Sequence, residues 1–223
     1  ELGESVPKDI TKCNAMSILG RTNRTLESVT DDEILSLQPM KCIKKSASIR
    51  IVSTLIRILI QDELFCQAAM LLGRLVTATL KEGLSDFAPL LFTHYGYMLM
   101  SFDSDINMAC RIGSLAIQLL EKVGAPPSVR IGVLSQTAYV TNWQQPLSLH
   151  LDKRIEAYQE SLRLGELAQA FHILSVYGME YFYSGLPLPP LVRDMKKFLE
   201  QMASYDQILL LFINLPLYQT ILN

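Results

Sequence analysis

Residues Tyr158–Leu188 read YQESLRLGELAQAFHILSVYGMEYFYSGLPL, and this stretch predicts the architecture of most of the chain. An amphipathic helix ends before Gly165-Glu166, a second helix with an aromatic stripe follows, and Gly185-Leu186-Pro187 ends it. Glycine and proline typically stand just beyond helix ends. The stretch therefore predicts two helices joined by a short turn, and short connections make consecutive helices antiparallel neighbours.

The same alternation of helix and turn continues through the chain from about residue 30. Thr30 followed by Glu33 is the pattern of a capping box, and apolar residues after Lys44 recur at spacings of three and four. The predicted helix pairs span 44–82, 85–123, 127–164 and 166–203, and a further pair begins over 205–223. Residues 1–29 are predicted to be a connector, partly irregular, with a short helix over Lys12–Leu19.

Two Tyr-Gly pairs inside predicted helices, Tyr95-Gly96 and Tyr177-Gly178, indicate an internal repeat. The separation of the two glycines equals two periods of about 41 residues, and this step keeps the four helix pairs in register. Such a period lies between the tetratricopeptide repeat, at about 34 residues, and armadillo or HEAT repeats, at about 40 to 47. A glycine inside a helix costs roughly 1 kcal/mol relative to alanine but lets a neighbouring helix approach closely.

From these observations we expect an all-α fold of stacked antiparallel helix hairpins, a tetratricopeptide-like α-solenoid covering residues 30–223. A closed helical bundle is the alternative architecture.

The composition argues against several classes of protein. Hydrophobic residues make up 49% of the 223 residues and charged residues 19%, which is unlike a disordered chain. The formal net charge of −2 provides no basic footprint for nucleic acid or for an anionic membrane. Four cysteines lie far apart, which argues against a disulfide framework and favours a reducing, cytoplasmic compartment. They are Cys13, Cys42, Cys66 and Cys110.

Two uncharged stretches raise the question of a membrane span. Gln207–Asn223 is shorter than the 20 or so apolar residues that a bilayer requires, and it contains Asn214 and Pro216. Ile131–Leu151 contains several amide side chains. Both are predicted to be buried helices, and no membrane span is expected. Because the chain begins with Glu1 and ends inside an apolar pattern, we expect it to be a piece of a longer protein.

No motif of the sequence indicates a reaction. A phosphate-binding loop, GxxxxGK[ST], and a nucleophile elbow, GxSxG, are both absent. His94, His150 and His172 each lack a second ligand at i+3 or i+4, so a surface or hydrogen-bonded core position is favoured over metal binding. We therefore predict that the chain is not an enzyme and has no catalytic residue, cofactor or metal site.

Charged residues in the predicted helical region have simple interpretations. Asp103 and Asp105 resemble the start of a calcium loop, but the rest of that loop is absent and a helix-capping turn is favoured. Glu180, which lies among aromatic residues, is predicted to be partly exposed. Four arginines are predicted to be solvated, namely Arg111, Arg130, Arg154 and Arg193.

The candidate binding residues are four aromatic side chains, Trp143, Tyr158, Tyr177 and Tyr181. They could line a groove for a peptide, as the concave faces of solenoids do, but filling the space between stacked helix pairs is favoured. The alternative function is an all-α domain that binds a small molecule, or catalyses a reaction, in an aromatic pocket formed by these residues. A pocket that collects Glu180, a histidine and an arginine would support that alternative.

Several packing motifs resemble those of a known family. They are Trp143-Gln144-Gln145-Pro146-Leu147, Ala157-Tyr158, the stretch LGELAQA at 164–170, Tyr181-Phe182 and Ser184–Leu188, with Leu37–Met40 and the Tyr95-Gly96 helix upstream. These motifs are similar to the helical-repeat region of large multidomain signalling ATPases. In that family a protein-kinase-like domain and an AAA/STAND-type ATPase precede tetratricopeptide-like helices, and GAF and histidine-kinase or cyclase modules often follow.

The resemblance implies a non-catalytic segment close to an ATPase core. Its expected partners are proteins or neighbouring domains of the same chain, which it would hold in a regulated arrangement. Two positions depart from the family pattern: Gln144 replaces a basic residue, and Glu166 replaces an aspartate. Both departures leave the packing plausible but put any shared charge-based contact in doubt.

Overall fold

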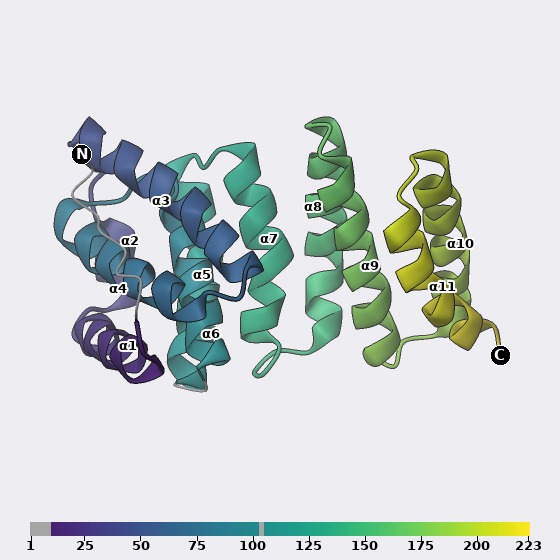
Figure 1. The fold of residues 1–223 in the computed structure, drawn as a ribbon, viewed down its shortest axis with the longest axis horizontal. Coiled ribbons are helices and arrows are strands. Elements are labelled where there is room, and N and C mark those ends of the chain that lie inside the picture. Colours follow the sequence, from purple (N-terminus) through teal and green to yellow (C-terminus); the bar gives the residue numbers. More distant parts are fainter. Residues whose placement is uncertain (1–9, 103–104) are drawn as a thin grey trace. The chain divides into compact units, whose positions relative to one another are not determined.

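A computed structural model describes residues 10–102 and 105–223 (Figure 1). These residues form eleven α-helices and one short 3₁₀ helix, and the only β-type pairing among them is an isolated bridge between Pro39 and Leu84. The all-α prediction is confirmed. The chain divides into two compact units, one ending at Trp143 and the other beginning at Gln144.

The first unit is built around α5. Its helices are α1 (Lys12–Glu27), α2 (Asp31–Ser36), α3 (Ile43–Gln61), α4 (Phe65–Glu82), α5 (Ala88–Ser101), α6 (Ile106–Val123) and α7 (Pro127–Thr141). Helix α5 packs on α4, α6 and α7, and α6 also packs on α7. Because neighbours cover α5 on several sides, it is apolar around most of its circumference, and Leu91, Tyr95 and Leu99 are all fully buried.

The second unit is built in the same way around α9. It contains the 3₁₀ helix η1 (Leu147–His150), α8 (Leu151–Arg163), α9 (Leu167–Tyr183), α10 (Leu188–Ser204) and α11 (Ile208–Leu222). Helix α9 packs on α8, α10 and α11, and α10 packs on α11. Each central helix therefore touches the two helices that follow it, and those two helices touch each other.

The two glycines singled out in the sequence occupy equivalent contacts in the two units. A Cβ atom at Gly96 would lie 2.9 Å from Val140 Cγ1 of α7 and 3.2 Å from the carbonyl oxygen of Ala109 in α6. A Cβ atom at Gly178 would lie 2.7 Å from Met195 Sδ of α10 and 3.3 Å from Leu217 Cδ2 of α11. Each glycine thus lets its central helix approach both of the helices that follow it.

The turns that end α4, α6, α8 and α10 share a backbone feature. Each contains one residue in the left-handed region, at Gly83 (φ 107°), Gly124 (φ 59°), Gly165 (φ 74°) and Asp206 (φ 54°). Glycine adopts such angles without strain, whereas aspartate is one of the few other residues that tolerates them. The four positions are equally spaced along the chain, at the period that the two Tyr-Gly pairs indicated.

The N-terminal region is more regular than the sequence indicated. Residues 1–29 were expected to be a connector with a short helix over Lys12–Leu19, and residues 1–9 of it lie outside the described part of the chain. From Lys12 to Glu27 the chain forms a helix that packs on α4. The contact is close because Gly73 of α4 faces α1: a Cβ there would lie 2.6 Å from Ile18 Cγ2.

Helix starts agree with the sequence at one site and differ at another. Thr30 and Glu33 form the expected capping box at the start of α2. The predicted pair 85–123 begins later than expected, because α5 starts at Ala88 with proline at its second position. The buried Ser85 hydroxyl before it has no hydrogen-bond partner. Asp105 caps α6 by accepting a hydrogen bond of 2.9 Å from the Met108 N–H. Asp103 lies outside the described residues.

Helix α11 is less buried than its composition predicts. Only Asn214 and Ile221 are buried, whereas Leu209 is 74% exposed and Phe212 is 66% exposed. The helix has apolar residues on all sides, but only α9 and α10 pack against it within its unit. No helix in the described ranges combines the length and the apolar character that a membrane crossing requires.

Alanine at Gly96 should destabilise the protein because the new methyl group would press on Val140 and on the backbone of Ala109. We expect a loss of roughly 1–3 kcal/mol in the free energy of unfolding, measured by urea denaturation. Gly20 of α1 is the matched control, since a Cβ there meets nothing within 4 Å, and Gly20→Ala should stabilise the helix by up to about 1 kcal/mol. Equal effects of the two substitutions would contradict the close-approach role of Gly96.

Candidate functional site

Two of the four aromatic candidates, Tyr158 and Tyr177, contact Phe198 of α10, and Tyr181 contacts Tyr177. The Phe198 ring centroid lies 6.4 Å from that of Tyr158 and 6.0 Å from that of Tyr177, and the Tyr177 and Tyr181 centroids are 5.9 Å apart. Such separations are those of favourable tilted or edge-to-face contacts. Trp143 belongs to the first unit, where its side chain is 65% exposed. Sequence reasoning did not select Phe198, although it lies three residues after the buried Met195.

The tyrosine hydroxyls of this set are also used within the second unit. Tyr158 donates to Gln201 Oε1 at 3.1 Å, and Tyr181 donates to the Pro187 carbonyl at 3.2 Å. The Tyr177 hydroxyl lies 3.4 Å from Asp194 Oδ2. Burial, followed by the charge of Asp194, raises the pKa of Tyr177 to about 12, so its phenol stays protonated. The three rings and hydroxyls together tie α8 and α9 to α10.

A buried ion pair joins α8 to α9. Arg154 Nε donates to Glu180 Oε2 at 2.9 Å, and Nη2 donates to Oε1 at 2.6 Å. Arg154 is 1% exposed and Glu180 is 7% exposed. The predictions of a solvated Arg154 and a partly exposed Glu180 were therefore wrong. The reason is that Arg154 shares the buried face of α8 with Ala157 and Ser161, so its guanidinium needs a partner inside the unit.

The second unit also places a histidine in this electrostatic environment. His150 is 2% exposed, and burial, followed by the charge of Lys153, lowers its pKa while the Glu180 carboxylate acts in the opposite direction. The charges of Glu180 and Arg154 thus both act on His150, but neither of the two pockets described below is lined by these three residues. Both carboxylate oxygens of Glu180 already accept hydrogen bonds from Arg154, so the carboxylate is held as one half of a structural pair.

The other three arginines differ in their surroundings. Arg111 of α6 donates to Asp31 Oδ1 at 2.7 Å and to the carbonyl oxygens of Leu26 and Val29, so the prediction of a solvated side chain was wrong there too. Arg130 is paired with Glu121 at 3.1 Å, and Arg193 is exposed. Arg111 ties the end of α1 and the start of α2 to α6.

His94 of α5 is the most deeply buried histidine. It is 1% exposed, its Nδ1 atom has no hydrogen-bond partner, and its ring is hydrogen-bonded to Gln136 of α7. Burial lowers the pKa of His94 to about 4, and the charge of Arg57 acts in the same direction. The ring is therefore neutral near pH 7 and serves as a core residue. Within residues 10–102 and 105–223, no group of three or more His, Cys, Asp or Glu side chains is placed to hold a metal ion.

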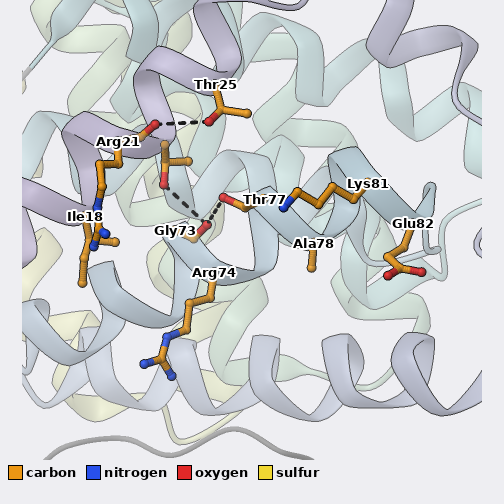
Figure 2. A pocket seen from close by; sticks show the side chains of 10 residues that line it. Ile18, Arg21, Thr25, Gly73, Arg74, Thr77, Ala78, Lys81 and Glu82 are labelled. Atoms are coloured by element: carbon orange, nitrogen blue, oxygen red, sulfur yellow. Dashed lines mark hydrogen bonds between the residues drawn. The ribbon is translucent and has the colours of Figure 1, made fainter.

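A groove of about 550 Å³ lies between α1 and α4 (Figure 2). Its walls carry Ile18, Arg21, Thr22 and Thr25 from α1 and Gly73, Arg74, Thr77, Ala78, Lys81 and Glu82 from α4. The hydroxyls of Thr22 and Thr77 both donate to the Gly73 carbonyl, at 3.4 and 2.8 Å. Figure 2 shows the Lys81 side chain running along α4 toward Thr77. Sequence reasoning missed this groove, because nothing in the sequence placed α1 against α4.

A smaller pocket of about 350 Å³ lies where the loops around Pro39 and Leu84 meet the end of α6. Its polar side chains are Ser46, Ser85, Asp86 and Lys122. None of the four aromatic candidates lines this pocket or the α1–α4 groove.

Comparisons of the chain with family models, curated proteins and solved structures gave no match.

Removing one partner of the buried ion pair should destabilise the second unit. Glu180→Gln would leave the Arg154 charge buried without its counter-ion, and we expect a loss of about 3 kcal/mol in the free energy of unfolding. The same change at Glu121, whose side chain is 76% exposed, should cost less than about 1 kcal/mol. The double variant Arg154→Met with Glu180→Leu should be more stable than Glu180→Gln. A double variant that is the least stable of the three would contradict this account.

The stability of the first unit should depend on the protonation of His94. The folded-state pKa of His94, about 4, lies below the ordinary histidine value of 6.5. The contribution of the neutral His94 ring to the free energy of unfolding is therefore complete above pH 6.5 and is lost as the pH falls toward 4. This lowering of the pKa of His94 corresponds to a loss of about 3 kcal/mol in the free energy of unfolding between neutral and acidic pH. In urea denaturation at pH 7.0 and 4.5, His94→Met should lose less stability on acidification than the wild-type chain. The control is His172, whose pKa burial also lowers but without the large shift of His94, so His172→Gln should change the pH dependence less than His94→Met does.

Proposed function

We propose that this chain is a non-catalytic helical-repeat scaffold that binds proteins or neighbouring domains of the same chain. The observation that carries the proposal is the equal spacing of the left-handed residues at 83, 124, 165 and 206. Helix pairs that recur at a constant spacing along the chain can stack on one another repeatedly. Such stacks form extended surfaces that suit protein partners better than small substrates.

The packing inside each unit gives independent support. Gly96 and Gly178 bring their helices against the next two helices in the same way, although each contact lies in a different unit. A repeated contact of this kind is expected when each helix pair seats the next one, as in tetratricopeptide-like stacks.

We further propose, from the resemblance of the packing motifs, that the scaffold is the regulatory segment of a multidomain, ATP-dependent signalling protein of the cytoplasm. It would hold the ATPase and output domains of that protein in a regulated arrangement. All four cysteines are free thiols, which suits a reducing compartment.

The alternative function, a small-molecule-binding or enzymatic domain, is favoured by one observation. Glu180, Arg154 and His150 interact electrostatically in the interior of the second unit. The bidentate pairing of Glu180 and the packing of Tyr158 and Tyr177 on Phe198 favour the scaffold instead.

Site-specific photo-cross-linking distinguishes the two functions. A photoreactive amino acid would replace Ile51, Tyr183 or Phe212, which are exposed on α3, α9 and α11, and the protein would be irradiated in extract of its source cells. A scaffold should form adducts with a defined protein at some positions only, and excess unlabelled chain should suppress them. Two results together would contradict the scaffold function. They are that excess unlabelled chain suppresses no adduct, and that a metabolite raises the melting temperature of the chain by more than about 3 °C.

A further inference from the structure

The groove between α1 and α4 owes its shape to a contact of small residues. At Gly73 the two helices approach so closely that a side chain there would overlap Ile18. Next to this contact both walls carry short side chains, Thr25 on α1 and Thr77 and Ala78 on α4, which leaves the groove open (Figure 2). Its volume of about 550 Å³ is within the range of ligand sites in proteins.

The floor of the groove is polar but already hydrogen-bonded. Thr22 and Thr77 donate to the Gly73 carbonyl, and Thr25 donates to the Arg21 carbonyl at 3.2 Å. Because these hydroxyl protons are directed at the backbone, the groove attracts a ligand mainly through charge, and Arg21 and Lys81 can supply that charge.

The charged side chains of the groove are mostly positive. Arg21 comes from α1, and Arg74 and Lys81 come from α4, whereas the single carboxylate, Glu82, is paired with Lys45 of α3. The chain as a whole has a formal net charge of −2, so the groove differs in sign from the rest of the molecule. Its charge is therefore complementary to a negatively charged ligand.

The spacing of the cations fits an extended ligand better than a single small anion. Arg74 and Lys81 are two helical turns apart, or roughly 10 Å along α4. Figure 2 shows the two side chains leaving α4 in different directions, with Arg21 on the opposite wall. The groove wall from Gly73 to Glu82 is roughly 14 Å long, which matches about four residues of extended peptide at roughly 3.3 Å each. Separate carboxylates along a peptide could meet Arg21 on one wall and Lys81 on the other.

We propose that the groove between α1 and α4 binds an acidic, extended peptide segment of a partner protein. This inference rests on the proposed scaffold function and names the chemistry of one of its partners. Arg21 and Lys81, on opposite walls, hold the carboxylates of the peptide. The short side chains between them leave room for the peptide backbone.

The test uses the whole 223-residue chain and a synthetic hexapeptide of alternating glutamate and alanine, capped at both ends and labelled with rhodamine. Binding is measured by fluorescence anisotropy in 50 mM salt. We expect a dissociation constant below about 1 mM, and weaker binding when the salt concentration is raised. The same peptide with glutamine in place of glutamate should bind at least about tenfold more weakly.

Charge reversals in the chain locate the site. Arg21→Glu and Lys81→Glu should each weaken binding by at least about fivefold. Lys12→Glu is the matched control, because Lys12 and Arg21 are nine residues apart on α1 and so lie on opposite faces of the helix, and it should bind like the wild-type chain. Arg21→Gln and Lys81→Gln are milder variants that remove each charge without reversing it. Thermal melts followed by circular dichroism show whether each variant is folded, so that a loss of binding can be distinguished from a loss of folding.

Several results would overturn the proposal. They are no binding up to about 1 mM, equal binding of the glutamine peptide, or equal loss in Lys12→Glu and Arg21→Glu. Competition by inorganic phosphate below about 1 mM would assign the groove to a small anion instead. The cross-linking experiment does not depend on the peptide-binding result. A failure of the groove proposal can therefore be distinguished from a failure of the scaffold proposal.

Discussion

Close approach of helices at a glycine is the contact on which both units depend. Gly96 and Gly178 stand inside α5 and α9, which each pack on at least three other helices of their unit. Glycine weakens an isolated helix by roughly 1 kcal/mol relative to alanine, so tertiary packing must offset that cost. In each unit it does so by letting two following helices reach one backbone face at once. The tyrosine before each glycine then fills the adjacent space and is itself buried.

Polar contacts fix which helices pair once the apolar contacts have formed. In the first unit, the Tyr95 hydroxyl lies 2.6 Å from Asn23 Oδ1, and Arg111 binds the end of α1 and the start of α2. In the second unit, Arg154 and Glu180 pair α8 with α9, and Asn214 joins α11 to Ser175 of α9. Apolar side chains could pack in several registers, whereas a buried charge that misses its partner is costly. These contacts therefore favour a single arrangement of helices within each unit.

The sequence predicted those features that depend on neighbouring residues. The 3.6-residue apolar period and the glycines and prolines at helix ends located the hairpins, and the Tyr-Gly pairs located the central helices. Features that depend on distant residues were missed. Arg154 and Glu180 are 26 residues apart, and only the shared spacing with Ala157 and Ser161 hinted that Arg154 faces inward. Helix α1 is polar overall, so the sequence did not predict that one of its faces is buried. That face contacts Gly73 of α4 and Tyr95 of α5, which are distant in the sequence.

The recurring left-handed residue has a consequence for how such a chain can change in length. A block cut between two successive positions of the set 83, 124, 165 and 206 begins and ends at a residue with positive φ. Duplicating or deleting a whole block would therefore leave the spacing between successive helix-ending turns unchanged. A single-residue insertion inside α9, by contrast, would rotate Gly178 by about 100° relative to the residues before it and turn it away from α10. Genes for chains of this kind are thus expected to tolerate changes of whole blocks far better than small insertions within a helix.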